Sequence, residues 1–199
     1  MPLLRPGARG RLLRRGSVAG VVVIGLYVLL FYSIAFYAAV THANPEPDFL
    51  AFYTGATIAR DGDFPHLYDE ATQLAIEQEL VPGREVLQPY LNPPLYAVLL
   101  SPLAGLSPKV AYSVAVVASL LLLCGGAILL WHLLRRADVN RRGCALFIGG
   151  FLLTPALWHG LWETQTSVPI LAAVLLSLFI APRQPLWAGV LLTALVIKP

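Results

Sequence analysis

The fold of this chain is decided by residues 110–134, VAYSVAVVASLLLLCGGAILLWHLL, and by the segment RRADVNRRG (135–143) that follows them. The first stretch contains no Asp, Glu, Lys or Arg, and as a helix it is long enough to cross a hydrocarbon core of about 30 Å. The second carries four arginines. Positive charge collects on the cytosolic side of a membrane. The pair therefore predicts a membrane-spanning helix that runs inward, followed by a cytosolic loop.

The composition of the whole chain agrees with a membrane protein. Hydrophobic residues make up 57% of the sequence and charged residues only 13%, against about 25% charged in a soluble domain. The apolar residues come in blocks long enough to be spanning helices. We therefore predict an all-α, polytopic helical membrane protein. No cluster of Lys and Arg interleaved with aromatic residues indicates a nucleic-acid surface.

The N-terminal part begins with a basic segment that precedes a long apolar run. RPGARGRLLRR (5–15) contains five arginines, and residues 17–41 are apolar over more than twenty positions, whereas the apolar region of a secretory signal is about 7–15 residues long. We predict a cytosolic tail over 1–16 and an uncleaved first spanning helix over 17–41.

Residues 42–92 form the only long polar segment. They contain nine acidic residues and two arginines, which predicts an extracytoplasmic loop. Within it, DEATQLAIEQEL (69–80) is typical of a short amphipathic helix, ended by Pro82-Gly83. Residues 93–107 are apolar but short, and Pro102 and Gly105 interrupt them. We expect a re-entrant or short membrane helix there, since a full crossing would place the four arginines of 135–143 outside.

Residues 144–199 predict further spanning helices over 144–157, 168–181 and 186–197, with WHGLWETQTS (158–167) as an outer loop. In this map ten of the fourteen basic residues are cytosolic, and ten of the eleven carboxylates are outside. The sequence stops at Lys198-Pro199 directly after an apolar stretch, which predicts that the chain is a truncated part of a longer protein.

Several polar and aromatic side chains lie on the outer side of this map. Asp48 follows the first span, Asn92 precedes Pro93-Pro94, and Glu163 and Gln165 lie in the last outer loop. A pocket of carboxylates, amides and aromatic faces suits a sugar or a lipid-linked polar head. The alternatives are structural. Asp48 would cap a helix beginning at Phe49, the aromatic residues would form a membrane-interface belt, and the acidic run 69–79 would be a solvated helix face.

Four blocks of the sequence resemble the bacterial membrane glycosyltransferases of family 87. They are DFLAFYTGATIARDGDFPHLYDEATQ, YLNPPLYAVLLSPLAGLSPKVAY, TQTSVPILAAVLL and PLWAGVLLTALVIKP, spread over residues 48–199. The resemblance implies GT-C class enzymes similar to polyprenol-phosphate-mannose-dependent mannosyltransferases. It makes Asp48 the catalytic base, Tyr68-Asp69 the family's LYD element, and Pro93-Pro94 its PP element. Gln165 stands where the family has Gly-Gln, with Thr164 in place of the glycine.

The resemblance implies transfer of a mannose-like hexose from a polyprenyl-phosphate donor to a hydroxyl group of a lipid or glycan acceptor. We expect the chain to lie in the bacterial inner membrane with its N-terminus in the cytosol, among membrane lipids, and to need neither a metal nor another cofactor. The residues predicted to bind substrate are Tyr53, Tyr68, Asp69, Asn92, Glu163 and Gln165. Those predicted as candidates for the phosphate are Arg60, His66, Arg84, Lys109 and His159.

Two other functions fit parts of the sequence. A transporter or flippase component would place ionisable residues within its spans. Residues 17–40, 111–130 and 144–157 contain no Asp, Glu, Lys, Arg or His, which argues against this function. An inactive, truncated paralogue that acts as a membrane scaffold would fit the early end of the sequence.

Overall fold

The computed structural model describes residues 25–27, 29–30, 33, 37, 47–83, 85–193 and 195. The chain divides into two units, Met1–Ala38 and Ala39–Pro199. The described residues of the first unit are all helical. Most of the spanning helix predicted over 17–41 lies outside the described residues. The second unit carries the elements considered below.

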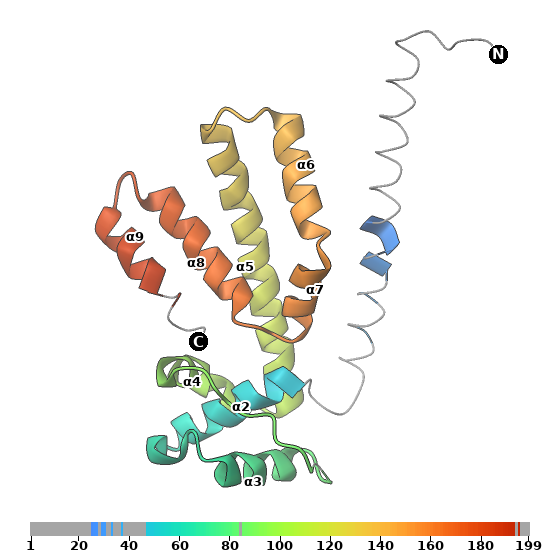
Figure 1. The fold of residues 1–199 in the computed structure, drawn as a ribbon, viewed down its shortest axis with the longest axis vertical. Coiled ribbons are helices and arrows are strands. Elements are labelled where there is room, and N and C mark those ends of the chain that lie inside the picture. The colour runs from blue at the N-terminus through green and yellow to red at the C-terminus, as the bar shows by residue number, and fades with distance from the viewer. Residues whose placement is uncertain are drawn as a thin grey trace, which may run out of the picture. The chain divides into compact units, whose positions relative to one another are not determined.

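The second unit is built from helices (Figure 1). No strand occurs in the described part of the chain, so the predicted all-α class is confirmed there. The α-helices are α2 (Pro47–Arg60), α3 (Glu70–Leu80), α4 (Pro94–Leu100), α5 (Pro108–Arg136), α6 (Arg141–Leu152), α7 (Pro155–Trp162), α8 (Ser167–Ile180) and α9 (Pro185–Leu192). Two 3₁₀ helices are η1 (Phe64–His66) and η2 (Ser101–Gly105).

The long helix α5 organises this unit, and it contains the predicted span 110–134. Pro108 lies in its first turn, where a missing backbone N–H costs nothing. Among the described helices, α5 is the one that alone is long and apolar enough to cross a membrane, while α6 and α7 would together make one bent span. The polytopic arrangement therefore stays a prediction.

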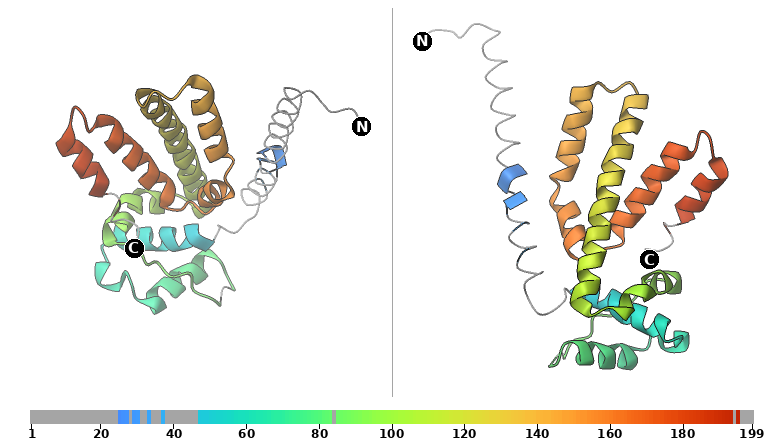
Figure 2. Two further views of the ribbon diagram at one scale, coloured as in Figure 1. Left: turned by 45° about the horizontal axis from the view of Figure 1, so that its top comes forward. Right: turned by 180° about the vertical axis from the view of Figure 1, so that it is seen from behind.

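Residues 47–106, which we call the platform, gather at the N-terminal end of α5 (Figures 1 and 2). Their core is aromatic: Phe52 packs edge-on against Tyr96, and Phe49 packs edge-on against Tyr112 of α5. Phe49, Phe52 and Tyr53 are all buried. Protein, not a membrane interface, surrounds these three rings, so the aromatic-belt interpretation does not hold for them.

The predicted amphipathic helix of the polar segment is present as α3, and Asp69 caps its N-terminus by accepting from the Thr72 amide. The buried side chains of α3 are Gln73 and Glu77. The interpretation of the acidic run as a solvated face is therefore wrong for Glu77. Its buried carboxylate accepts a backbone hydrogen bond from Gln88, in the segment that follows α3.

The short apolar segment after Pro93 forms α4 and η2, with the change of helix type at Ser101-Pro102. Pro102 cannot donate a backbone hydrogen bond, which accounts for the break. The re-entrant or short membrane helix expected over 93–107 stays a prediction.

Helices α6, α7 and α8 lie beside α5, and α9 packs against α8; we call these five helices the α5–α9 bundle (Figure 2). The chain bends by 53° between α6 and α7, at Thr154-Pro155, because proline cannot donate to the preceding turn. The helix then resumes and continues to Trp162. The predicted outer loop 158–167 is therefore wrong for residues 158–162, which are helical. The expected helix over 168–181 corresponds to α8, and the one over 186–197 begins as α9, which ends at Leu192. Residues 194, 196 and 197 of that prediction lie outside the described residues.

Candidate active site

Asp48 lies in the first turn of α2, which begins at Pro47. The predicted alternative, a cap for a helix beginning at Phe49, does not match this placement, because Asp48 is already inside the helix. The unpaired N–H groups and the dipole of a helix N-terminus favour negative charge there. The start of α2 therefore gives an ionised carboxylate a favourable position close to the α5–α9 bundle.

The turn between α7 and α8 presents Glu163 and Gln165 toward Asp48. It is a Schellman motif: the backbone N–H of Gln165 donates to the Gly160 carbonyl, and the backbone N–H of Thr164 donates to the Leu161 carbonyl. Thr164 has φ +52°, the left-handed conformation that glycine adopts most easily. This geometry gives a physical reason for the glycine that the resemblance places at this position.

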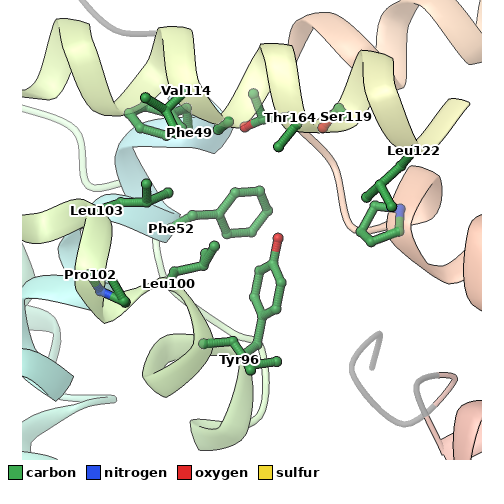
Figure 3. A pocket seen from close by; sticks show the side chains of 14 residues that line it. Phe49, Phe52, Tyr96, Leu100, Pro102, Leu103, Val114, Ser119, Leu122 and Thr164 are labelled. Carbon is green, nitrogen blue, oxygen red and sulfur yellow. The ribbon is translucent and has the colours of Figure 1, made fainter. Parts of the chain in front are cut away.

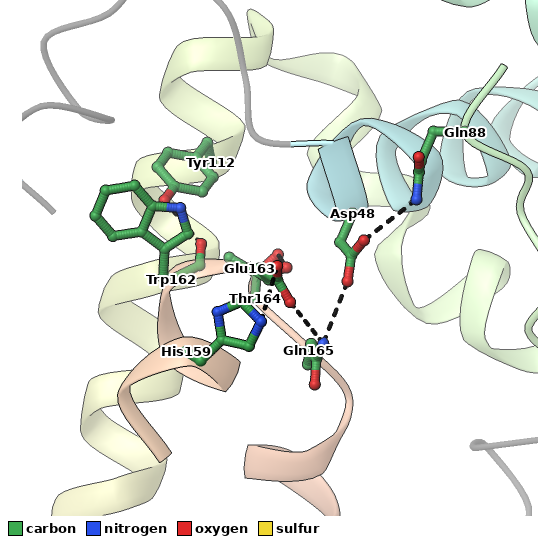
Figure 4. A network of polar contacts seen from close by, with 8 residues as sticks. All are labelled: Asp48, Gln88, Tyr112, His159, Trp162, Glu163, Thr164 and Gln165. Carbon is green, nitrogen blue, oxygen red and sulfur yellow. Dashed lines mark hydrogen bonds and ion pairs between the residues drawn. The ribbon is translucent and has the colours of Figure 1, made fainter. Parts of the chain in front are cut away.

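One amide group joins the two carboxylates (Figure 4). Nε2 of Gln165 donates to Oε2 of Glu163 at 2.7 Å and to Oδ2 of Asp48 at 3.3 Å. Nε2 of His159 lies 3.2 Å from the other oxygen, Oε1, of Glu163. The predicted meeting of Asp48, Glu163 and Gln165 is thus confirmed, and His159 joins them. Their chemical roles stay predictions.

The surroundings of Glu163 disfavour its charged form. Burial and the nearby negative charge of Asp48 raise the pKa of the Glu163 carboxyl above its usual value, while His159 and the Gln165 amide act in the opposite direction. The network thus places two carboxylates close enough to influence each other, with one partly exposed histidine beside them.

Other residues predicted to bind substrate make contacts within the platform. The Tyr53 hydroxyl donates to the Leu106 carbonyl at 2.7 Å, and the Tyr68 hydroxyl donates to the Asn92 carbonyl at 2.9 Å. Asp69 is the cap of α3. Asn92 is predicted to approach the same cavity as Asp48. The hydrogen bond described for it is the one that its carbonyl accepts from Tyr68. Substrate binding by these four residues stays a prediction.

The predicted phosphate candidates are spread over the unit. Arg60 is at the opposite end of α2 from Asp48, where it donates to the Ala104 carbonyl, and His66 pairs with Asp63. Lys109 is exposed in the first turn of α5. Arg84 lies outside the described residues. Only His159, among the described candidates, has a recorded contact with the carboxylate network.

A cavity of about 280 Å³ lies beside the network, between the platform and the α5–α9 bundle (Figure 3). Its walls are mostly apolar and include Phe52, Tyr96 and Leu122. Phe49 and Thr164 also line it; the first follows Asp48 in sequence, and the second lies between Glu163 and Gln165. An apolar space therefore adjoins the polar groups.

Gln88 is the site residue that the sequence did not reveal. Its Nε2 donates to Oδ1 of Asp48 at 3.3 Å (Figure 4). It lies in an irregular segment, residues 85–93, where a single glutamine follows no helical or strand periodicity. No local pattern could have paired it with a carboxylate 40 residues earlier.

The comparison with protein families covers the C-terminal part of this site. The family model for glycosyltransferase family 87 matches residues 90–199, more than half of the chain. The chain belongs to glycosyltransferase family 87. The family match includes His159, Glu163 and Gln165, while Asp48 and Gln88 precede it. No curated protein and no solved structure matches the chain.

Proposed function

We propose that this chain transfers a hexose from a polyprenyl-phosphate donor to a hydroxyl group of a lipid or glycan acceptor, with Asp48 as the general base. The acceptor oxygen forms a bond to the anomeric carbon while the bond from that carbon to the phosphate oxygen breaks. The hydroxyl proton moves to the Asp48 carboxylate, and polyprenyl phosphate leaves with its negative charge. A base of this kind needs a carboxylate within hydrogen-bond reach of the acceptor.

The observation that carries the proposal is the meeting of Asp48 with Gln165, which is 117 residues away in the chain. Both amide hydrogen bonds to Asp48 are 3.3 Å long, beyond the usual 2.9–3.0 Å. A carboxylate accepts at about four lone-pair sites, so an acceptor hydroxyl can bind Asp48 while both amides stay in place.

The donor would use the apolar cavity and the exposed edge of the network. The walls formed by Phe52, Tyr96 and Leu122 suit the first part of a polyprenyl chain. His159, whose side chain is 61% exposed, would face the phosphate and stabilise the charge that develops on it. Arg60, His66, Arg84 and Lys109 stay candidates for the same task.

The proposed setting is a bacterial inner membrane, with a GT-C class arrangement of several spans and the site on the extracytoplasmic side. Support comes from the length and apolar composition of α5 and from the arginines that follow it. A lipid-linked donor places its phosphate at the depth of the lipid headgroups, which is also the depth predicted for Asp48.

Replacement of Asp48 by asparagine tests the base. Asp48→Asn keeps the size of the side chain but removes the proton acceptor, and transfer should fall about 100-fold or more. The matched control is Asp61→Asn, the same change at an exposed carboxylate in the turn after α2, which should keep parental activity. Transfer from a polyprenyl-phosphate donor in liposomes is the measurement. Activity within a few-fold of the parent for Asp48→Asn would contradict the proposal.

A further inference from the structure

Gln88 gives Asp48 a second amide partner, from a different part of the chain than Gln165. The two amides approach different oxygens: Gln88 donates to Oδ1, and Gln165 donates to Oδ2. An amide has no proton to give up near neutral pH and carries no charge. It can therefore orient a carboxylate without neutralising it, which a lysine or an arginine in the same place would not do.

The backbone of Gln88 and of nearby Tyr90 is held by two buried polar residues of α3. The backbone amide of Gln88 donates to Oε2 of Glu77 at 3.1 Å, and the backbone amide of Tyr90 donates to Oε1 of Gln73 at 2.8 Å. Nε2 of Gln73 donates to the Leu67 carbonyl. Gln73 and Glu77 are four residues apart, so they lie on one face of the helix. Together they fix the backbone of the irregular segment from which the Gln88 side chain extends.

The burial of Glu77 indicates that this arrangement has a purpose. Its side chain is fully buried, and burying a carboxylate is costly even when it is hydrogen-bonded. An apolar residue at this position could not accept the Gln88 backbone amide. Glu77 thus helps to fix the position of the Gln88 backbone.

We propose that Gln88 is a positioning residue for the Asp48 carboxylate and that the buried face of α3 holds it in place. This inference rests on the proposed function, in which Asp48 is the base. Its consequence is that α3, which has no recorded contact with Asp48, contributes to catalysis through the segment that follows it. A base displaced by about 1 Å can lose up to about 100-fold in rate.

Two substitutions at position 88 separate positioning from a general structural role. Gln88→Met removes the amide, and kcat should fall about 10-fold or more, with little change in the KM for the donor. Gln88→Glu is nearly isosteric, but its new carboxyl can donate to Asp48 only when protonated, and it repels Asp48 when ionised. The ratio of Gln88→Glu activity to parental activity should therefore rise steadily as the pH falls from 8 toward about 5.

The matched control is Gln184→Glu, the same charge change at an exposed position next to α9, whose ratio to the parent should not depend on pH. A flat ratio for Gln88→Glu would overturn the proposal. If Asp48→Asn is inactive while that ratio is flat, the positioning role alone fails. If Asp48→Asn keeps parental activity, the proposed function fails and the positioning role fails with it.

A second measurement does not depend on turnover. The Tm of the parent, Gln88→Met, Asp48→Asn and the double variant forms a cycle that reports the coupling between the two side chains. We expect the Tm loss of the double variant to differ from the sum of the two single losses. Strictly additive losses would show that the two side chains do not interact in solution and would overturn the proposal.

Discussion

The platform and the α5–α9 bundle differ in how much of their helices they bury. In the platform, α2 is buried at almost every position from Phe49 to Ala59. In the bundle, α5 exposes large apolar side chains such as Val117, Leu121 and Ile128. An apolar surface of that extent on a soluble monomer marks an interaction site, and lipid would cover it at no cost. The candidate site lies where the two regions meet, with Asp48 and Gln88 from the platform and Glu163 and Gln165 from the bundle.

The largest effect expected from this difference is all-or-none and concerns topology. In a background without Cys124 and Cys144, Asp61→Cys in the platform should react with an impermeant thiol reagent on intact cells. Ala137→Cys, in the exposed turn between α5 and α6, should react only after the cells are opened. The reason is the four arginines around residue 137, which favour the cytosol. Labelling of both positions on intact cells would mean that residues 93–107 cross the membrane.

Glycine substitutions test how tightly each region is packed. A Cβ added at Gly55 of α2 would lie 2.5 Å from the ring of Tyr90, which is completely buried. Gly55→Ala should therefore destabilise the protein by about 1–3 kcal/mol. A Cβ at Gly125 of α5 meets nothing within 4 Å, and Gly125→Ala should stabilise the helix by up to about 1 kcal/mol. Thermal unfolding measures both, and equal effects would remove the proposed difference in packing.

The sequence predicted elements whose signals are local. The apolar run of α5, the short helix predicted over 69–80 and its end before Pro82-Gly83 each follow from residues within a few positions of the structure that they specify. The continuation of α7 to Trp162 was missed, because a loop was expected as soon as polar residues appeared. Helical geometry after Pro155 depends on contacts with α5 and α8, which a local pattern does not contain.

For the site, the topology map predicted that Asp48, Asn92, Glu163 and Gln165 would share one outer pocket. Asp48, Glu163 and Gln165 meet, although they are far apart in sequence. The same reasoning could not find Gln88 or the buried face of α3. An isolated glutamine in an irregular segment has no periodicity, and a buried glutamate looks like any other member of an acidic run. Which carboxylate is buried follows from the path of the next segment, and that path is determined only by tertiary packing.

A smaller effect is expected at the turn that carries the site. Thr164 is held at φ +52°, which costs a residue with a branched Cβ about 1–2 kcal/mol. Thr164→Gly should relieve this strain and raise stability by up to about 1 kcal/mol after the loss of the buried side chain. Thr166 is equally buried, but its φ is −60°. Thr166→Gly should therefore destabilise, and a loss of Tm for both variants would contradict the account of the turn.

The smallest effect concerns the charge of Glu163. Its pKa is raised in the folded protein, first by burial and then by Asp48, so its contribution to stability is fully present below the unfolded pKa of about 4.3. That contribution is lost as the pH rises through the folded pKa. Glu163→Gln, which stays uncharged, should match the parent near pH 4 and become more stable than it toward pH 7. Because the side chain is 22% exposed, we expect a gain below about 1 kcal/mol.

His159→Gln should act in the opposite direction, since it removes a partner that favours the charged carboxylate. Unfolding measured from pH 4 to 8 gives both curves, and a Glu163→Gln curve parallel to that of the parent would mean that the two carboxylates do not influence each other.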